Sequence, residues 1–507
     1  MKDLSYDVVV IGAGNGGLAA AATTAQKGLK TLLVEQHNLP GGFASSFVRG
    51  RFEFEPSLHE MCDVGVQGCL GGAGEFFESI GLKVEWLRIA DAYRMVVDGE
   101  SKLDVTMPFG TQAYIDKMEE YVPGSRESVT NFFELSQEVV DGIGYIGKSK
   151  GNPDKQVLMS KYANFLKTAS YTLDQVEKAL KIPDKACEIL NAYWCYIGTE
   201  TSRVNFTIFA AMMLKFIAGG AVIPKNRSHE ISLAFESRIR EFGGDIMYST
   251  KVDKILVEDG AVAGVLTTGG RKIKAKHVIS NAAKHIVYSQ MLEQTSEMSK
   301  ECNSRRIGGK GYVAYFGLNK TMEEIGLTDY SYFIYPSTDT KKMYDSFASR
   351  DGDPLQAVVC LNNVNPGCSP EGTSMLTITT IYTDDAWDDV EEKNYVKAKN
   401  DIARKMIARF ESVMGVSIAD AIEEFEVASP ETFARYTGAY DGGIYGYEPE
   451  ALDSIMPRLM MLDDDMHVKG LRFCGGFAFR CHGYASSYMS GNTAGLLTYR
   501  DSTEVKS

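Results

Sequence analysis

The chain has 507 residues, and a rough 150 residues per domain predicts two to four domains. Apolar residues make up 44% and charged residues 24%, a composition that excludes disorder as the main state. The net charge of −14 and the pI near 5.2 disfavour nonspecific binding to nucleic acid, so we expect no nucleic-acid partner.

The cysteine content and the first residues predict a cytoplasmic protein. The nine cysteines form no C-x-x-C pair and are odd in number, which suits a reducing compartment. The first residues show no charged-then-apolar presequence. The most apolar stretch, 206–223, contains Lys215 and a break at Gly219 and Gly220, which leaves about 13 helical residues, too few to cross a membrane. Two interpretations stay open: a buried helix ended by glycine, or a helix that dips into lipid or lines an apolar substrate tunnel.

The strongest local pattern is a nucleotide-binding turn at residues 6–35. The β-branched run YDVVVI predicts a buried strand, GAGNGG follows it, and an alanine-rich helix and a second short strand complete a βαβ unit. Gly12 permits the tight turn, Gly14 lets the backbone approach a pyrophosphate, and Gly17 allows close packing of helix on strand. Ala13 and Gly16 complete the turn, and Glu35 at the end of the second strand is expected to accept hydrogen bonds from ribose hydroxyls. The order of these parts predicts a dinucleotide site.

The segment after this unit identifies the dinucleotide by resemblance. Gly41 and Gly42 open a small-residue loop that includes Ala44 and Ser45, and an F-x-F strand and His59 follow. This pattern resembles the phytoene desaturase, carotenoid isomerase and retinol saturase superfamily of FAD-dependent oxidoreductases. The resemblance implies that the loop runs along FAD.

Three further blocks extend the resemblance. Residues 219–283 are expected to contain a helix at 232–242, an antiparallel ribbon and a VISNA segment. The resemblance places the backbone of Val252 against the adenine end of FAD. It also implies that the segment containing Asn281 completes the cofactor domain. Residues 429–448 match the most family-specific string, and we expect a strand and turn of the substrate domain there. In residues 470–499 the resemblance assigns Gly475 and Gly476 to the ribityl chain, and a helix beginning near Tyr484 and Ala485 to the pyrimidine edge of the flavin.

The predicted fold class is α/β. A Rossmann-like FAD-binding domain of the glutathione-reductase type, a βαβ unit plus an antiparallel ribbon, is expected from 1–80, 225–290 and 455–507. An interleaved α+β substrate-binding domain is expected from 81–224 and 291–454, with helices at 127–146 and 390–414.

Candidate catalytic residues come from two loops that the resemblance places beside the flavin. The Pro-Gly-Gly usual in the family is replaced by Arg-Cys-His at 480–482, so polar side chains lie where many members are apolar. Arg480 or His482 could polarise a carbonyl or carboxylate, and Tyr484 or His59 could deliver a proton; Glu60 beside His59 is a further candidate. For each of them a structural hydrogen bond is the alternative.

The resemblance implies an enzyme that saturates or desaturates a C=C bond of a hydrophobic substrate, such as an isoprenoid, retinoid, steroid-like compound or other lipid. No second G-x-G-x-x-G follows a strand, and we expect no strand before Gly71, Gly72 and Gly74. The flavin must therefore exchange electrons with a diffusing donor or acceptor, or return them to the same substrate. The alternatives are a redox-neutral double-bond isomerase and, more remotely, a noncatalytic prenyl-chain escort. The histidines lack ligand spacing, so we expect no metal. Peripheral membrane contact through 206–214 stays open, and the oligomeric state is not predicted.

Overall fold

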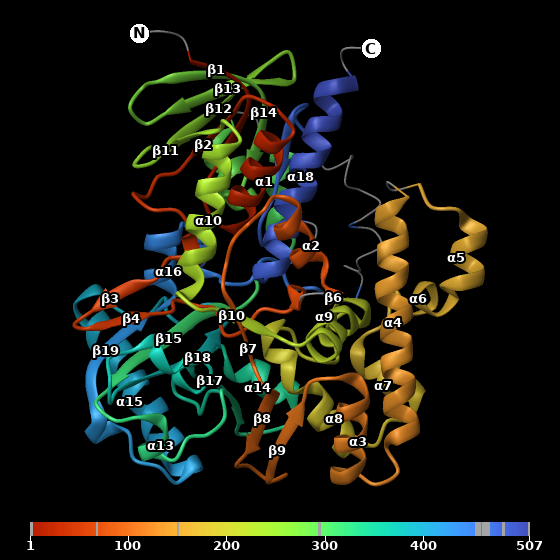
Figure 1. Ribbon diagram of the computed structural model, residues 1–507, viewed down its shortest axis with the longest axis vertical. Helices are drawn as coiled ribbons and strands as arrows, with labels where there is room; N and C mark the ends of the chain where they lie inside the picture. The colour runs from red at the N-terminus through yellow and green to blue at the C-terminus, as the bar shows by residue number, and fades with distance from the viewer. Residues whose placement is uncertain are drawn as a thin grey trace.

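The computed structural model describes residues 4–66, 69–149, 152–292, 296–451, 458, 467–478 and 482–504. Within them, two seven-stranded sheets lie one above the other along the long axis of the molecule, and a column of helices flanks the second (Figure 1). The described cysteines are free thiols. None of the helices in these ranges combines the length and apolarity needed to cross a bilayer.

The first sheet joins segments that are far apart in the chain. Its order is β11-β2-β1-β14-β13-β12, with β20 paired to β14. The strands that build it are β1 (Leu4–Ile11), β2 (Thr31–Val34), β11 (Asp245–Met247), β12 (Val252–Glu258), β13 (Ala261–Thr267), β14 (Lys272–Ser280) and β20 (Leu471–Phe473). β1 pairs in parallel with β2 and β14, whereas β12, β13 and β14 form an antiparallel ribbon. This confirms the predicted Rossmann-like unit with its ribbon.

Three helices accompany this sheet: α1 (Asn15–Gln26), α10 (Arg227–Glu241) and α18 (Tyr484–Glu504). α1 and α18 pack tightly because glycines lie between them. A Cβ atom on Gly491 would lie 2.0 Å from the carbonyl oxygen of Gly16, and one on Gly495 would lie 2.8 Å from Cβ of Thr23. The small residues therefore bring the C-terminal helix against the glycine turn at the other end of the sequence.

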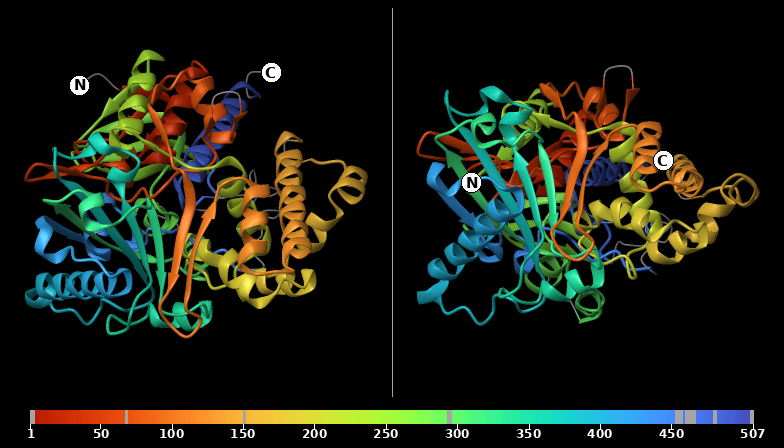
Figure 2. Two further views of the ribbon diagram at one scale, coloured as in Figure 1. Left: turned by 60° about the horizontal axis from the view of Figure 1, so that its bottom comes forward. Right: turned by 90° about the horizontal axis from the view of Figure 1, so that it is seen from below.

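The second sheet has the order β19-β15-β18-β17-β16-β8-β9. Its strands are β8 (Asp91–Val97), β9 (Leu103–Pro108), β15 (Lys310–Leu318), β16 (Ser331–Tyr335), β17 (Gln356–Cys360), β18 (Ser374–Tyr382) and β19 (Ile422–Ala428). All nine residues of β15 are buried, as expected for a central strand covered on both faces. Figure 2 shows the β8–β9 hairpin beside strands from much later in the chain, in agreement with the parallel pairing of β8 with β16.

The flanking column contains α3 (Thr111–Tyr121), α4 (Arg126–Lys148), α5 (Lys155–Lys161), α6 (Ala163–Thr168), α7 (Leu173–Leu180), α8 (Asp184–Leu190) and α9 (Phe206–Gly219). α4 matches the helix predicted at 127–146. α9 ends where the sequence indicated, since Gly220 adopts a φ of 72°. The remaining helices and short strands are β3 (Phe47–Arg49), β4 (Phe52–Phe54), β5 (Gly65–Val66), β6 (Cys69–Leu70), α2 (Gly72–Ser79), β7 (Trp86–Arg88), β10 (Val222–Pro224), α11 (Lys284–Ile286), α12 (Ser296–Asn303), α13 (Met322–Ile325), α14 (Thr340–Ser346), α15 (Tyr395–Met414) and α16 (Pro430–Thr437).

Several expectations require correction. A two-residue strand, β6, directly precedes Gly71, where no strand was expected. The segment 429–448 begins not with a strand but with α16, because Ser429 forms a capping box with Thr432 and Pro430 occupies the first turn. α10 begins at Arg227, earlier than the predicted 232. α15 begins at Tyr395 rather than at 390, since a short 3₁₀ turn precedes it.

The apolar segment 206–214 does not form an exposed lid. In α9, Phe206, Phe209, Ala210 and Met213 are fully buried in the core. This segment therefore does not offer the exposed apolar surface that membrane contact would need. The division into two domains at the stated boundaries stays a prediction.

Candidate functional site

A cavity of about 1410 Å³ lies between the two sheets. It is lined by most of the residues predicted to form the site: Gly12, Gly14, Gly16, Glu35, Gly41, Gly42, Ser45, His59, Glu60, Val252, Asn281, Gly475, Gly476, His482, Tyr484 and Ala485. Ala13, Gly17 and Ala44 are predicted site residues that lie behind this lining. Arg480 lies outside the described residues.

The glycine turn has no room for side chains. Gly12 adopts a φ of 89°, and a Cβ atom on Gly17 would lie 1.9 Å from the carbonyl oxygen of Gly12. At Gly14 and Gly16 a Cβ atom would lie 2.6 Å from the side-chain amide of Asn281. The backbone at the start of α1 is therefore bare toward the cavity, as the approach of a pyrophosphate requires.

The carboxylate of Glu35 is fixed by backbone groups. Its Oε2 accepts a hydrogen bond from the Ala13 N–H at 2.6 Å, and its Oε1 accepts one from the His37 N–H at 2.7 Å. Each oxygen keeps a lone pair, and Glu35 lines the cavity at the end of β2. This oriented carboxylate suits a ribose hydroxyl donor.

The small-residue loop runs alongside the glycine turn. The Gly41 N–H donates to the Ala13 carbonyl oxygen at 2.8 Å, and Gly41 adopts a φ of 123° that only glycine adopts readily. Ala44 is fully buried, and its carbonyl oxygen accepts a hydrogen bond from the Ser232 hydroxyl of α10. Gly42 and Ser45 remain on the cavity side.

The segment after β20 and the start of α18 contribute residues to the other end of the cavity wall. Gly475 adopts a φ of 85° and donates its N–H to the Ser490 hydroxyl at 2.8 Å. α18 begins at Tyr484, and its first residues line the cavity. The cavity fits FAD, because it is lined by glycine turns without side chains, by the oriented carboxylate of Glu35 and by the first residues of α1 and α18. These residues would hold its pyrophosphate, its ribose and the edge of its flavin.

His59 is half-buried at the cavity wall and neutral. Its Nε2 lies 3.0 Å from the Thr379 hydroxyl, and its Nδ1 has no hydrogen-bond partner among the described residues. Burial lowers the pKa of His59 to about 4. At neutral pH the imidazole is therefore uncharged.

Glu60 is a carboxyl group that keeps its proton at neutral pH. It is 6% exposed and lines the cavity. Burial raises its pKa to about 8, although a hydrogen bond from the Tyr196 hydroxyl to Oε1, at 3.0 Å, acts in the opposite direction. Within the described ranges, Oε2 of Glu60 has no hydrogen-bond partner. The nearby Tyr193 hydroxyl also acts to lower the pKa of Glu60, but less than Tyr196 does.

His482 and Tyr484 are engaged with backbone carbonyl oxygens. His482 donates from Nε2 to the carbonyl oxygen of Tyr196 at 2.8 Å, and its ring stacks on Tyr445 at 4.1 Å. Burial lowers the pKa of His482 to about 4, so this histidine has no N–H left to polarise a substrate carbonyl. The Tyr484 hydroxyl donates to the Phe43 carbonyl oxygen at 2.9 Å. The geometry at both residues favours the structural alternative over polarisation or proton delivery.

Tyr196 links these groups, and the sequence reasoning missed it. Its hydroxyl holds Glu60, its carbonyl oxygen holds His482, and its ring meets that of His59 edge-on with centroids 6.1 Å apart. The only local signal is the aromatic run NAYWCY, which is equally typical of a core.

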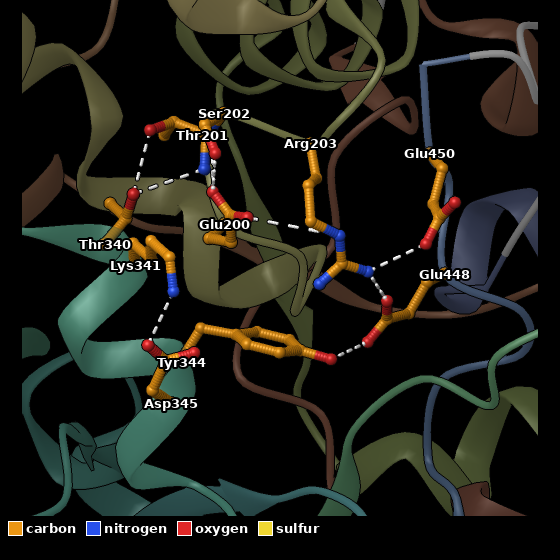
Figure 3. Close-up of polar contacts among 10 residues, drawn as sticks. All are labelled: Glu200, Thr201, Ser202, Arg203, Thr340, Lys341, Tyr344, Asp345, Glu448 and Glu450. Carbon is orange, nitrogen blue, oxygen red and sulfur yellow. Dashed lines mark hydrogen bonds and ion pairs between the residues drawn. The ribbon is translucent and has the colours of Figure 1, made fainter.

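A polar bracket holds the chain just after Tyr196. Arg203 binds Glu448 and also Glu450, the latter at 2.8 Å, while its guanidinium lies 5.0 Å from the ring centroid of Tyr344 (Figure 3). Tyr344 donates to Glu448 from the opposite side. Thr201 is hydrogen-bonded to Thr340 at the start of α14, with the hydroxyls 2.8 Å apart. We define Glu200, Thr201, Ser202, Arg203, Thr340, Tyr344, Glu448 and Glu450 as the Arg203 bracket.

Comparisons with known proteins agree with this geometry. A family model described as FAD dependent oxidoreductase matches residues 7–128. The chain is 25% identical to prolycopene isomerase of Daucus carota over 97% of its length and 79% of that protein's length. It is also 25% identical to all-trans-retinol 13,14-reductase of Danio rerio, covering 87% of the chain and 77% of that protein.

Among solved structures, an oxidoreductase from Methanosarcina mazei has the same fold. The TM-score is 0.65 at 15% identity, with 97% of this chain and 99% of that chain covered. Together with the glycine turns and the hydrogen-bonded Glu35, the family model identifies FAD as the cofactor. These findings confirm the resemblance of the chain to the superfamily of FAD-dependent oxidoreductases that contains the carotenoid isomerases and retinol reductases.

Proposed function

We propose that this protein adds hydrogen across a C=C bond of a hydrophobic unsaturated substrate, such as an isoprenoid, a retinoid or another lipid. The observation that carries the proposal is Glu60, a protonated, buried carboxyl group that lines the cavity. Bound FAD supplies the hydride chemistry at N5 of its flavin. A proton must come from elsewhere, and Glu60 holds one at neutral pH.

The surroundings of Glu60 keep that proton in place. Tyr196 donates to Oε1, so the acidic proton belongs on Oε2, the oxygen without a geometric partner. Aromatic side chains lie near the partners of Glu60, since Phe216 packs against Tyr196 and both residues line the cavity. Because the group is protonated at pH 7, it is suited to donating a proton, which favours saturation over desaturation.

His59 and His482 contribute shape and hydrogen-bond acceptors rather than charge. Both rings are neutral at physiological pH, and each has a buried Nδ1 without a hydrogen-bond partner in the described part of the chain. His59 can relay or orient a proton near Glu60, whereas His482 fixes the Tyr196 backbone. Arg480 and Tyr484 keep their candidate roles in polarisation and proton delivery only as predictions.

A redox-neutral double-bond isomerase is the second candidate. The similarity to prolycopene isomerase over nearly the whole chain favours it. A carboxyl group that can donate and recover a proton also serves a bond shift. The noncatalytic escort loses its support, since the glycine cradle and the Glu35 contacts for a cofactor are intact.

An anaerobic assay tests these proposals. The FAD-loaded protein is reduced with dithionite and mixed with a panel of polyenes and enones, and both the flavin absorbance and the product mass are followed. For a saturase, the flavin is reoxidised and the product gains two hydrogens, both of them deuterium when the flavin is reduced with dithionite in D₂O, because the hydrogen on flavin N5 also comes from solvent. For an isomerase, product of unchanged mass accumulates without reoxidation. A protein that cannot be loaded with FAD, or that transforms no member of the panel, would contradict the proposal.

The same panel tests the electron partner. We propose a diffusing donor or acceptor, because no dedicated nicotinamide-binding motif follows a strand in the sequence. The turnover rate should depend on the chemistry of the electron carrier, and it should differ between artificial dyes and NADPH. Saturable, tight binding of NADPH to the oxidised enzyme would contradict this part of the proposal.

A further inference from the structure

One face of α9 lines the cavity and changes from apolar to charged along its length. Ile208, Ala211, Met212 and Lys215 follow the spacing i, i+3, i+4, i+7, are half-buried, and all line the cavity. The other side of this helix is packed into the core. The cavity face of α9 is therefore apolar for two turns and then ends on an ammonium group.

The neighbouring wall has the same apolar character. Val140 and Ile143 lie one turn apart on α4, are half-buried and also line the cavity. Ile208 and Lys215 lie about 10 Å apart along the axis of α9, a length that suits a short run of hydrocarbon chain. This arm of the cavity can bury an extended apolar chain and present a cation to one end of it.

Lys215 is bound to Asp63 but is not saturated by it. Its Nζ lies 2.8 Å from Oδ2 of Asp63, and 35% of the lysine side chain remains accessible. An ammonium group has three N–H donors, and this contact uses one. The Asp63 carboxylate is also stabilised by the Gly72 N–H at the start of α2, which donates to Oδ1 at 3.1 Å. Because Asp63 has this second source of stabilisation, Lys215 can bind another anion beside it.

We propose that Lys215 binds a carboxylate at one end of the substrate while the hydrocarbon chain lies between α4 and α9. This inference names the substrate class and rests on the proposed function, since it assumes that the cavity holds an unsaturated lipid. A carboxylate is favoured because an ammonium group beside an apolar wall gains most from an opposite charge with low solvent exposure.

A fluorescent polyene fatty acid, cis-parinaric acid, tests the inference without turnover. The FAD-loaded protein is titrated with the acid and with its methyl ester, and the change in probe fluorescence gives both dissociation constants. The acid should bind more tightly than the ester. Lys215→Met should weaken binding of the acid about tenfold or more and leave the ester within twofold, whereas Lys215→Arg should retain most of the affinity.

Asp63→Asn and a surface lysine provide matched variants. Asp63→Asn removes a competing charge and retains an oxygen for Gly72, so it should tighten binding of the acid several-fold. Lys341→Met, at an exposed lysine on α14, should change neither constant. Equal weakening of acid and ester by Lys215→Met, or no preference of the unmodified chain for the acid, would overturn the inference. Probe binding does not depend on the reaction, so the two proposals can fail separately. If Lys215→Met loses the preference for the acid but the reaction assay fails, only the proposed function is contradicted.

Discussion

The Arg203 bracket and the group around Glu60 both bury carboxyl groups, yet they treat them in opposite ways. Glu448 in the bracket accepts from an arginine and a tyrosine, so its buried charge has partners. Glu60 accepts one hydrogen bond from a tyrosine and has no cation beside it in the described structure. The first arrangement suits a charged group that holds two segments together. The second suits a neutral acid that can give up its proton. Removing the cation from a buried carboxylate is costly for stability, whereas a buried carboxyl group without a cation is a candidate for chemistry.

Replacing the unpaired acid should have the largest effect. We expect Glu60→Gln to lower kcat by about 10²- to 10⁴-fold, because the amide keeps the shape but has no acidic proton. The flavin absorbance should be unchanged, which shows that the cofactor site is intact. The matched change Glu448→Gln should leave kcat within about twofold. Equal losses of activity in the two variants would remove the distinction.

The unpaired acid should also leave a signature in stability. The pKa of Glu60 is about 8 in the folded chain, above its ordinary value near 4.5, so the folded state binds more protons between these values. The free energy of unfolding should therefore fall as pH rises from about 4.5 to 8, by an amount on the order of 5 kcal/mol from this group. Urea unfolding of the unmodified chain and of Glu60→Gln, compared across this range, isolates the contribution. Parallel pH curves for the two proteins would show that Glu60 does not hold the proton.

Removing the cation of the bracket should destabilise the fold without altering the chemistry directly. Arg203→Met leaves Glu448 buried without its cation, and we expect a loss of about 3 kcal/mol in the free energy of unfolding. Protonation of Glu448 relieves the cost, so the loss should be smaller at acidic pH. Lys341→Met, at an exposed pair on α14, should leave the urea midpoint unchanged. A native-like midpoint for Arg203→Met would show that the bracket is not a stabilising contact.

The smallest expected effect is at Tyr196, which binds Glu60 and lies just before the Arg203 bracket in the chain. The hydrogen bond from Tyr196 to Oε1 lowers the pKa of Glu60. Tyr196→Phe removes this bond and should therefore raise the pKa of Glu60. The alkaline limb of the pH–rate profile should therefore move to higher pH, while stability falls by about 1 kcal/mol. A shift of the limb to lower pH would contradict the assigned hydrogen bond.

Much of the cofactor site could be predicted from the sequence. Gly12, Gly14, Gly17 and Glu35 lie within one continuous βαβ unit, and local backbone geometry alone decides what glycine permits there. The capping signal at Ser429 and Pro430 is equally local, so the start of α16 is also encoded in contiguous residues. The candidate roles of His482 and Tyr484 could not be judged from sequence, since their partners are the backbone carbonyl oxygens of Tyr196 and Phe43.

The sequence by itself determined the α/β class, the glycine turn with Glu35 and the helices that end at glycine, because these depend on contiguous residues. Only the tertiary structure decided which polar groups lose their solvent and what they meet. Tyr196 is 136 positions from Glu60 and 286 from His482, and Lys215 is 152 from Asp63. Burial and charge pairing are set by such distant neighbours, and it is burial that makes Glu60 an acid with a proton to give.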